Sequence, residues 1–366
     1  MNQVVAIACG GTGGHFYPGL AIGRELRERS AGVVLFIAGQ NQARQLEVAR
    51  DNGFTAIPAD AVRLPRSAKT ALEFATGFPK AIFAHSKAMK EHGVTAALGM
   101  GSFASAPLCL AAKKRGLPLF LHEGNTTAGK ANRKFASMAK CLMTAFPLTN
   151  APPKANTQVV GMPLRQELVA AANEPCPPER QRELRQSLGL DPDLPTILVF
   201  GGSQGAQKIN QAVIETCEVR KKSDIQLMWL TGTDDNDELK TRLKNCGVRN
   251  LVEPRTQDMA TRYLASDAVI CRAGASSITE LALFGRAPLL IPLPTAADNH
   301  QQTNADWAVA TDGAECCPQS DFTPDFLGTW LSNFLSEPEV WHKKGQNLAG
   351  HAKPNAAKDA VDILLK

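Results

Sequence analysis

Two glycine-rich stretches, GGTGGH at 10–15 and GGSQG at 201–205, each follow a short apolar run. The runs VVAIAC (4–9) and TILVF (196–200) are rich in β-branched residues, which predicts buried strands. Glycines let backbone N–H groups approach a ligand closely, and the N-terminus of a following helix, here suggested by Pro18, favours negative charge. Both stretches therefore predict a phosphate site, although a tight turn that binds nothing is the alternative for the first stretch alone.

Two polar side chains within these stretches could take part in chemistry. His15 could act as a general base near neutral pH, while a loop histidine bonded to a backbone carbonyl is the commoner case. Ser203 could donate its hydroxyl to a phosphate at the start of a helix. Neither stretch has the form GxxxxGK[ST], which excludes an ATP-type P-loop, and the departure from GxGxxG weighs against a dinucleotide-dependent dehydrogenase.

Carboxylate and amide side chains in the second half could recognise a nucleotide sugar. Glu280 ends the pattern SITE, so it could complete a capping box or accept hydrogen bonds from both hydroxyls of a ribose. Gln301 and Asn304 carry amides, which both donate to and accept from sugar hydroxyls. The alternative is that they are merely exposed beside a helix start capped by Asp298 and Asn299. Spacing alone leaves each pair of interpretations open.

No pattern in the chain predicts a metal or another cofactor. The acidic runs DDND (234–237) and DPD (191–193) contain Asp-x-Asp pairs, but their polar surroundings are typical of solvated turns. The nine cysteines lack CxxC or Cys/His metal-ligand spacing, which favours a reducing, cytoplasmic compartment. No basic residues precede an apolar core at the N-terminus, so we expect no signal peptide.

Positive charge is concentrated in the first half of the chain. The net charge of the whole chain is +5, whereas residues 62–140 carry +10 and the remainder −5. Within that region, LEFATGFPKAIFAHSKAMK (72–90) alternates phenylalanines with lysines, which suits docking on an anionic membrane surface. A core helix with a solvated lysine face explains it equally well. Nucleic-acid recognition motifs are absent, so we predict no nucleic-acid partner.

The strand–glycine–helix pattern recurs at 95–112, 117–133 and 266–285. The uncharged stretch 93–112 fits this pattern better than a membrane-spanning helix, because it contains glycines and a proline. Strands that alternate with helices predict parallel sheets with ligands at the carboxyl ends of the strands. We therefore predict an α/β chain of two Rossmann-like domains facing a central cleft. Their predicted bounds are 1–162 and 163–336, followed by a helical segment, 337–366, that packs back across the hinge.

Six motifs carry a resemblance to a known family. They are GGTGGHFYPGLA, GMGSFASAP, HEGNTTAGKANR, VVGMPLR, FGGSQGAQKIN and CRAGASSITELALFGRAPLLIPLP…DNHQQTNA, in that order. Over nearly its whole length the chain resembles the undecaprenyl-diphospho-muramoylpentapeptide β-N-acetylglucosaminyltransferases of peptidoglycan synthesis. The resemblance implies a GT-B fold and inverting transfer of N-acetylglucosamine from UDP-N-acetylglucosamine to the C4 hydroxyl of undecaprenyl-linked muramoylpentapeptide. That reaction converts lipid I to lipid II without a bound metal, at the cytoplasmic face of the membrane, where the enzyme is peripheral.

The resemblance also implies roles for individual residues. His15 matches the family's candidate catalytic base, with Glu123 as the next candidate. Glu280 would bind the ribose, Gln301 the sugar hydroxyls, and the backbone near Thr256 the uracil. The other implied substrate-binding residues are Thr12, Gly13, Gly14 and Asn125 for the donor sugar region, and Arg165, Ser203, Ala275, Ser276 and Ser277 for the diphosphate.

Two motifs depart from the family pattern. Gly124 stands where the family usually has glutamine, between Glu123 and Asn125. Ser102 and Phe103 stand where it usually has glycine and tyrosine. Both departures lie in the acceptor-side half, so the donor is better specified by the sequence than the details of acceptor recognition.

Three alternative functions fit parts of the same pattern. They are a GT-B glycosyltransferase acting on another glycolipid such as diacylglycerol, a UDP-sugar epimerase, and a non-catalytic scaffold for wall synthesis. The basic, phenylalanine-bearing segment weighs against a soluble epimerase. The presence of Asn125, Glu280 and Gln301 weighs against a scaffold.

Overall fold

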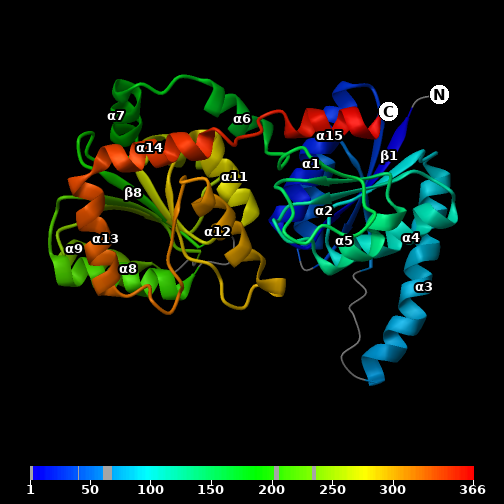
Figure 1. Cartoon of the computed structure of the whole chain (residues 1–366), viewed down its shortest axis with the longest axis horizontal. Coiled ribbons are helices and arrows are strands. Elements are labelled where there is room, and N and C mark those ends of the chain that lie inside the picture. The colour runs from blue at the N-terminus through cyan, green and yellow to red at the C-terminus, as the bar shows by residue number, and fades with distance from the viewer. Residues whose placement is uncertain (1–2, 40, 61–67, 202–205, 233–235) are drawn as a thin grey trace. The chain divides into compact units, whose positions relative to one another are not determined.

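The computed structural model describes residues 3–39, 41–60, 68–201, 206–232 and 236–366. Ser203 and the first two residues of the DDND run lie outside these residues. The chain divides into two compact units, Met1–Arg165 with Lys353–Lys366, and Gln166–Ala352 (Figure 1). The division falls three residues after the predicted boundary. The predicted C-terminal segment is shared, because its first part belongs to the second unit and its last part to the first.

The described part of the first unit has a seven-stranded parallel sheet in the order β3-β2-β1-β4-β5-β6-β7. Its strands are β1 (Val4–Gly10), β2 (Gly32–Ala38), β3 (Thr55–Pro58), β4 (Ala96–Gly99), β5 (Leu119–Glu123), β6 (Cys141–Thr144) and β7 (Thr157–Val159). Its helices are α1 (Gly13–Glu28), α2 (Gln42–Asp51), α3 (Ala68–Glu91), η1 (Phe103–Ser105), α4 (Ala106–Lys114), α5 (Lys130–Phe135), η2 (Ala136–Met138) and α15 (Ala356–Leu364).

Helices cover both faces of this sheet because both sets of alternating side chains on its strands are apolar. Val5 and Ile7 of β1 pack in one core with residues of α1, α2 and α15. Ala6 and Ala8 face the opposite core, which α3, α4 and α5 cover. Val361, on α15, is completely buried in the first of these cores, so the end of the chain is an integral part of the first unit.

The second unit repeats this plan. Its described strands form a six-stranded parallel sheet in the order β10-β9-β8-β11-β12-β13. They are β8 (Thr196–Phe200), β9 (Gln226–Leu230), β10 (Arg249–Glu253), β11 (Ala268–Cys271), β12 (Pro288–Leu290) and β13 (Glu315–Cys316). The helices are α6 (Gln166–Asn173), α7 (Pro178–Ser187), α8 (Gln207–Arg220), α9 (Asp237–Asn245), α10 (Met259–Ala265), α11 (Ala275–Phe284), η3 (Ala297–Asn299), α12 (His300–Ala310), α13 (Pro324–Ser336) and α14 (Pro338–Ala349).

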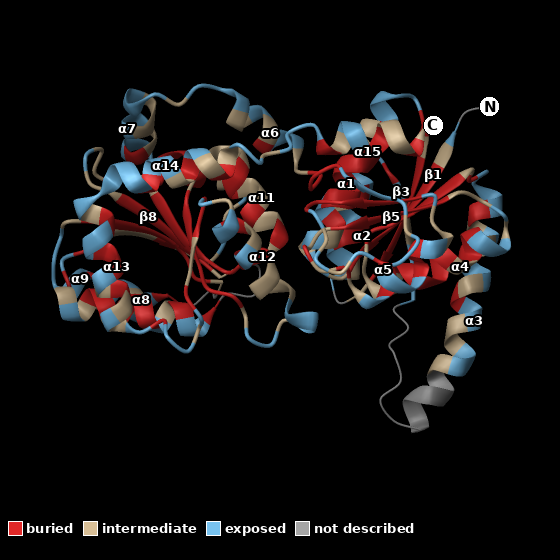
Figure 2. Ribbon diagram, in the orientation of Figure 1, coloured by how far each residue is buried: buried red, intermediate tan, exposed pale blue. Residues whose placement is uncertain are grey.

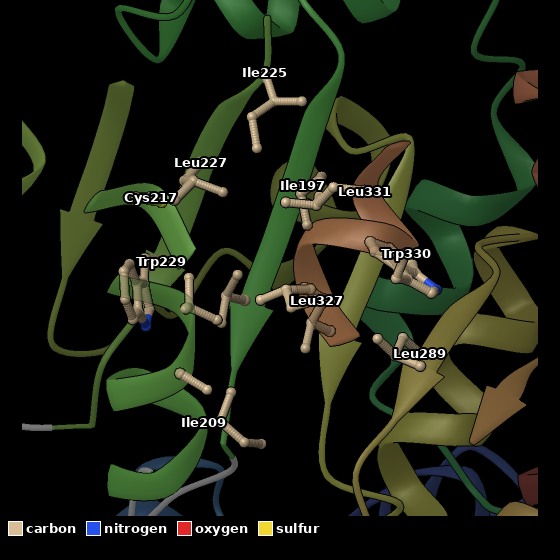
Figure 3. Close-up of a cluster of buried hydrophobic side chains, with 14 of the residues drawn as sticks. Ile197, Ile209, Cys217, Ile225, Leu227, Trp229, Leu289, Leu327, Trp330 and Leu331 are labelled. Carbon is tan, nitrogen blue, oxygen red and sulfur yellow. The ribbon is translucent and has the colours of Figure 1, made fainter. Parts of the chain in front are cut away.

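One face of the second sheet carries a large apolar core. Ile197 of β8 lies among side chains of α8 and α13, including Leu327 and Trp330 (Figure 3). Trp330 stacks edge-on against Trp341 of α14, with ring centroids 4.8 Å apart. The central strands of both units are almost entirely buried, whereas the edge strands β3, β7, β10 and β13 are partly or fully exposed (Figure 2). The prediction of two Rossmann-like parallel sheets is confirmed.

The shared strand order fixes where ligands can bind. In each sheet the order of strands reverses between two neighbours, β1 and β4 in the first unit and β8 and β11 in the second. At such a switch point the loops leave the carboxyl ends of adjacent strands in opposite directions and open a crevice. The loops after these four strands are therefore the structural candidates for a binding site.

The first helix begins earlier than its proline indicated. Helix α1 starts at Gly13, and Pro18 lies inside it. The carbonyl of Thr12 accepts hydrogen bonds from the N–H groups of His15 and Phe16, which closes the first turn before the proline is reached. His15 is therefore a helical residue rather than a loop residue.

The lysine- and phenylalanine-rich segment lies on the long helix α3. Ala81, His85 and Met89 are buried on one side of it, while Phe83 is 69% exposed on another. The following uncharged stretch forms β4, η1 and α4, as expected. Within the described residues, no helix is long and apolar enough to cross a membrane.

Candidate active site

His15 is held by Thr12, its neighbour at the start of α1. The hydroxyl of Thr12 lies 3.0 Å from Nδ1 of His15, within hydrogen-bond distance. Thr12 is exposed and His15 half-buried, so both lie at the surface of the first unit. A bond at Nδ1 fixes the orientation of the ring and leaves the proton-transfer role to Nε2.

Arg165 lies close to the same turn. Its guanidinium carbon is 5.7 Å from the ring centre of Tyr17, two residues beyond His15, which is cation–π range. Tyr17 is 37% exposed, so this pairing holds the guanidinium at the surface. The structure thus brings Arg165 to the His15 turn; its predicted partner Ser203 lies outside the described residues.

Glu123, at the end of β5, is a buried carboxylate surrounded by donors. It is 3% exposed. Its Oε1 accepts from the backbone N–H and the side-chain amide of Asn125, at 3.0 and 3.1 Å. Its Oε2 accepts from the N–H of Gly129 at 2.8 Å and from the amide of Asn132 at 2.9 Å. Four donors occupy the acceptor capacity of a carboxylate, so Glu123 anchors the loop that carries Asn125 and is poorly suited to act as a base.

The neighbouring His122 ties β5 to the segment that leads to Arg165. Its Nε2 donates to the carbonyl of Gly161 at 3.0 Å. Burial, the largest cause, lowers the pKa of His122, so the ring is neutral at pH 7 and carries its proton on Nε2. Gly161 has φ +96°, and a Cβ there would collide with the Cβ of Lys353, so only glycine fits. Positive charge on His15 lowers this pKa further.

Sequence reasoning did not single out His122 or Asn132. Asn132 donates to the carbonyl of His122 as well as to Glu123 and is 1% exposed. The sequence feature that could have identified them is their position: both are polar residues near the end of an apolar strand, His122 within the HEGN motif and Asn132 after it. Their role in orienting the loop depends on contacts that span ten residues of sequence.

The structure shows what surrounds Gly124 and Phe103, the residues at the two departures from the family pattern. A Cβ at Gly124 would lie 2.7 Å from the methyl carbon of Met162, so that side chain occupies the space beside position 124. The ring centroid of Phe103 lies 6.1 Å from that of Phe78 and 6.4 Å from that of Phe74 on α3. The phenyl ring at 103 thus joins an aromatic cluster with the segment predicted to meet the membrane.

In the second unit, helix α11 starts directly after β11 without a side-chain cap. Its N-cap is Gly274, which has no side chain to accept a hydrogen bond from the N–H groups of the first turn. The N–H groups of Ala275, Ser276 and Ser277 are therefore the first donors of an uncapped helix, where anions bind favourably. The predicted diphosphate-binding residues 275–277 lie at this N-terminus.

Glu280 does not belong to a capping box. The helix begins two residues before Ser277, so Ser277 is inside α11 and cannot be its N-cap. Oε2 of Glu280 instead accepts a hydrogen bond of 2.8 Å from the hydroxyl of Tyr263 on α10. The carboxylate thus lies one turn beyond the anion-binding end of the helix, on a half-buried residue.

Gln301 and Asn304 have different environments. Oε1 of Gln301 accepts from the N–H of Leu293 at 2.9 Å, so the oxygen of this amide is already bonded within the loop after β12. Asn304 is fully buried and donates to the carbonyl of Ala273 at 3.2 Å, so the interpretation of Asn304 as a sugar-binding residue is wrong. It holds the loop before α11 to α12.

The turn before Gln301 is strained. Asp298 and Asn299 both have left-handed backbones, with φ values of +51° and +54°. Asn299 is the N-cap of α12 but makes no side-chain cap bond, so the capping interpretation of this residue is also wrong. Left-handed residues other than glycine cost free energy and often occur at binding sites.

Thr256 lies between β10 and α10. Its hydroxyl accepts from the N–H of Asp258 at 3.1 Å, and Asp258 in turn caps α10 by accepting from the N–H of Thr261. These bonds give the loop a fixed shape. The side chain of Thr256 is used within the loop, so the backbone is the part that can recognise a base.

Arg272, which sequence reasoning also missed, links three loops of the second unit. Its Nη1 donates to the carbonyls of Ile291 and Pro292 at 3.0 and 3.3 Å, and Nη2 donates to Gln319 at 2.6 Å. It is 9% exposed, and burial lowers its pKa. Arg272 therefore fixes the loops after β12 and β13 against the end of β11.

The predicted site residues thus fall into two groups. In the first unit, His15, Thr12, Arg165 and the Glu123–Asn125 loop gather at the ends of β1 and β5. In the second unit, the start of α11, Glu280, Gln301 and Thr256 lie at the carboxyl ends of the strands. Within the part of the chain that the structure describes, no three His, Cys, Asp or Glu side chains form a metal-binding group.

Comparison with known proteins gives this arrangement a family. A model of the glycosyltransferase family 28 N-terminal domain matches residues 5–144, and a model of the C-terminal domain matches residues 196–360. A relative from Magnetococcus marinus is 33% identical over 98% of this chain and 95% of its own length, and one from Dechloromonas aromatica is 34% identical over 99% and 98%. The chain belongs to glycosyltransferase family 28.

Both family 28 relatives are named UDP-N-acetylglucosamine–N-acetylmuramyl-(pentapeptide) pyrophosphoryl-undecaprenol N-acetylglucosamine transferase. Among solved structures, MurG of Acinetobacter baumannii matches with a TM-score of 0.80 and 26% identity, over 100% of this chain and 99% of that one. A UDP-GlcNAc 2-epimerase from Neisseria meningitidis, bound to UDP-GlcNAc, matches at a TM-score of 0.70 with 13% identity, over 99% and 100% of the two chains. The likeness to the epimerase shows only the fold. The predicted GT-B fold is confirmed for this family 28 member.

Substitution of Glu123 tests its role as an anchor. We expect Glu123→Gln to lower the free energy of unfolding of the first unit by about 1–3 kcal/mol, because an amide N–H₂ would then oppose buried N–H donors. Hydrogen exchange of the β5 amides measures this loss within the intact chain. Glu91→Gln, at an exposed position of α3, is the matched control. Equal protection in the two variants would contradict the anchoring role.

Proposed function

We propose that this chain transfers N-acetylglucosamine from UDP-N-acetylglucosamine to the C4 hydroxyl of undecaprenyl-linked muramoylpentapeptide, converting lipid I to lipid II. The observation that carries the proposal is the near full-length identity of 33–34% to transferases named for this reaction. The two groups of site residues support it, because they supply a base and a set of anion and ribose contacts.

The reaction needs one bond to form as another breaks. The acceptor C4 oxygen attacks C1 of N-acetylglucosamine, and the bond from C1 to the UDP oxygen breaks on the opposite face, which inverts the configuration. Nε2 of His15 takes the proton of the attacking hydroxyl. A hydroxyl is a poor nucleophile until this proton leaves, so removal of the proton by the base lowers the activation barrier.

The departing UDP carries the negative charge that develops in the transition state. The N–H groups at the start of α11 are oriented before the reaction and lose no energy in reorganising. Arg165 and Ser203 add a cation and a hydroxyl to the diphosphate. Glu280 binds the ribose, the backbone at Thr256 the uracil, and the N–H₂ group of Gln301 a sugar hydroxyl. Thr12, Gly13, Gly14 and Asn125 serve the donor sugar.

We also propose that the enzyme works as a peripheral protein on the cytoplasmic face of the membrane, where its lipid acceptor lies, and binds no nucleic acid. Lys80, Lys87 and Lys90 are exposed on α3 beside Phe83. Phe74 and Phe78 stack on this helix with centroids 4.8 Å apart. An exposed basic helix with accessible aromatic rings suits an anionic lipid surface.

The direct test is a reaction of the purified chain with labelled UDP-N-acetylglucosamine and lipid I. We expect a β-linked disaccharide lipid and stoichiometric UDP. Label on a diacylglycerol acceptor, or formation of an epimerised UDP-sugar without acceptor, would contradict the proposal and support one of the alternatives.

Replacement of the base should slow turnover strongly. We expect His15→Ala to lower kcat by about 10²- to 10⁴-fold, with little change in the Kd of UDP, because a positioned base contributes on that scale. The acidic limb of the kcat/KM profile should disappear with it. His92→Ala, an exposed histidine at the end of α3, is the control. Retention of near-normal kcat or of the acidic limb would show that His15 is not the base.

Membrane binding should depend on charge. We expect flotation with vesicles to require anionic lipid and to weaken with added salt, since each basic residue near the surface contributes about 1 kcal/mol. Replacement of the three exposed lysines of α3 by alanine should release the protein. The control is a triple alanine variant of exposed lysines in the second unit, Lys221, Lys222 and Lys240. Salt-insensitive binding, or equal loss in both variants, would contradict the role of α3.

A further inference from the structure

Tyr263, on α10, is a completely buried residue with a single polar group aimed at the site. Its exposure is 0%, and its hydroxyl donates to Oε2 of Glu280 at 2.8 Å. The rest of the ring lies in an aromatic environment. Its centroid is 5.1 Å from that of Phe284 and 6.3 Å from that of Phe200. A buried tyrosine hydroxyl needs an acceptor, and here the acceptor is the carboxylate assigned to the ribose.

The backbone of Tyr263 is fixed as firmly as its ring. The guanidinium of Arg286 donates to the carbonyl of Tyr263 at 2.8 Å and to that of Leu264 at 2.9 Å. The hydroxyl of Ser266 donates to the same tyrosine carbonyl at 3.0 Å. Cations and hydroxyls at the end of a helix satisfy its last carbonyls, so α10 is held in place at the residue that carries the ring. The position of the Tyr263 hydroxyl is therefore determined by the core of the second unit.

We propose that Tyr263 is a positioning residue that sets the orientation of the Glu280 carboxylate and thereby determines recognition of the ribose diol of the donor. This inference rests on the proposed function, in which Glu280 binds that ribose. A glutamate side chain has several rotamers, and ordering it at the moment of binding weakens binding. The hydrogen bond from a rigid donor supplies that order before the ligand arrives.

The bond from Tyr263 also favours a carboxylate that accepts hydrogen bonds from the ligand. A tyrosine hydroxyl that donates to the carboxylate favours its ionised form, which acts only as an acceptor. A carboxylate has about four acceptor sites, so a bond to Tyr263 is compatible with hydrogen bonds from two ribose hydroxyls. Glu280 held in this way favours a diol, whose two hydroxyls donate, over a deoxyribose.

The test compares UDP with 2′-deoxy-UDP as ligands in calorimetric titrations of the full chain. We expect Tyr263→Phe to raise the Kd of UDP by about 3- to 10-fold and that of 2′-deoxy-UDP by less than 2-fold, because Tyr263 orients the carboxylate toward the 2′-hydroxyl, which the deoxy ligand does not have. The KM for the donor should rise while kcat at saturating donor is retained. The phenyl ring keeps the packing against Phe200 and Phe284, so the fold should persist, as near-ultraviolet circular dichroism can check.

Two further variants separate the possible outcomes. Thr216→Val removes another buried hydroxyl of the second unit, whose bond to the Ala212 carbonyl lies within α8, and should leave both Kd values unchanged. Glu280→Ala should abolish the preference for UDP over 2′-deoxy-UDP. Adding Tyr263→Phe to that variant should change neither Kd further. If Glu280→Ala leaves the preference intact, the ribose role of Glu280 is wrong. If Glu280→Ala abolishes it and Tyr263→Phe does not reduce it, the positioning role alone is overturned.

Discussion

In the proposed function, the donor half of the site depends on hydrogen bonds from the backbone N–H groups at the start of α11. They have no partner inside the helix, and the N-cap is a glycine that supplies no side-chain acceptor. A parallel sheet places this helix end beside the switch point between β8 and β11, where a ligand can reach it. An anion at this position completes the hydrogen bonding of the helix. In the same proposal, the loops after β10, β12 and β13 contact the uracil and the sugar.

Two carboxylates among the candidate site residues, Glu123 in the first unit and Glu280 in the second, are ordered by hydrogen-bond donors in different ways. Glu123 accepts four hydrogen bonds from its own loop, and this uses its capacity to shape the backbone around Asn125. Glu280 accepts from a hydroxyl on a separate helix, which orients it without closing a loop on it. The source of the donors thus differs: Glu123, at the end of β5, is bonded within its own loop, whereas Glu280, which we propose binds the ribose, is bonded to a neighbouring helix.

The fold was predictable from the sequence because it depends on local patterns: apolar strands, glycine loops and amphipathic helices that alternate through most of the chain. The helix starts were less predictable. Pro18 suggested a helix start, yet the carbonyl of Thr12 begins α1 five residues earlier. Likewise the SITE pattern suggested a capping box, while Gly274 starts α11 before its serine. In both helices, a glycine-rich turn starts the helix ahead of the residue that the local pattern favoured.

Candidate site residues could be named from the sequence, but their hydrogen-bond partners could not. His15, Glu280 and Gln301 could be selected because their chemistry and position in motifs matched a sugar-nucleotide enzyme. Tyr263 and His122 could not, since each acts through a contact with a residue or backbone group far along the chain. Asn304 shows the converse: its amide suits a sugar, but α12 buries it completely. Burial and long-range pairing are properties of the folded chain alone.

The central claim is that helix N–H donors and a cation bind the donor diphosphate, so that the charge of UDP is met by the protein itself. Calorimetric titration of the chain with UDP and with uridine, each in EDTA and in excess Mg²⁺, tests it most directly. We predict that UDP binds at least about 10²-fold more tightly than uridine, since charge-assisted hydrogen bonds each contribute about 1.5–3 kcal/mol, and that Mg²⁺ leaves this ratio unchanged. Equal affinities for UDP and uridine in EDTA, or a preference for UDP that appears only with Mg²⁺, would contradict it.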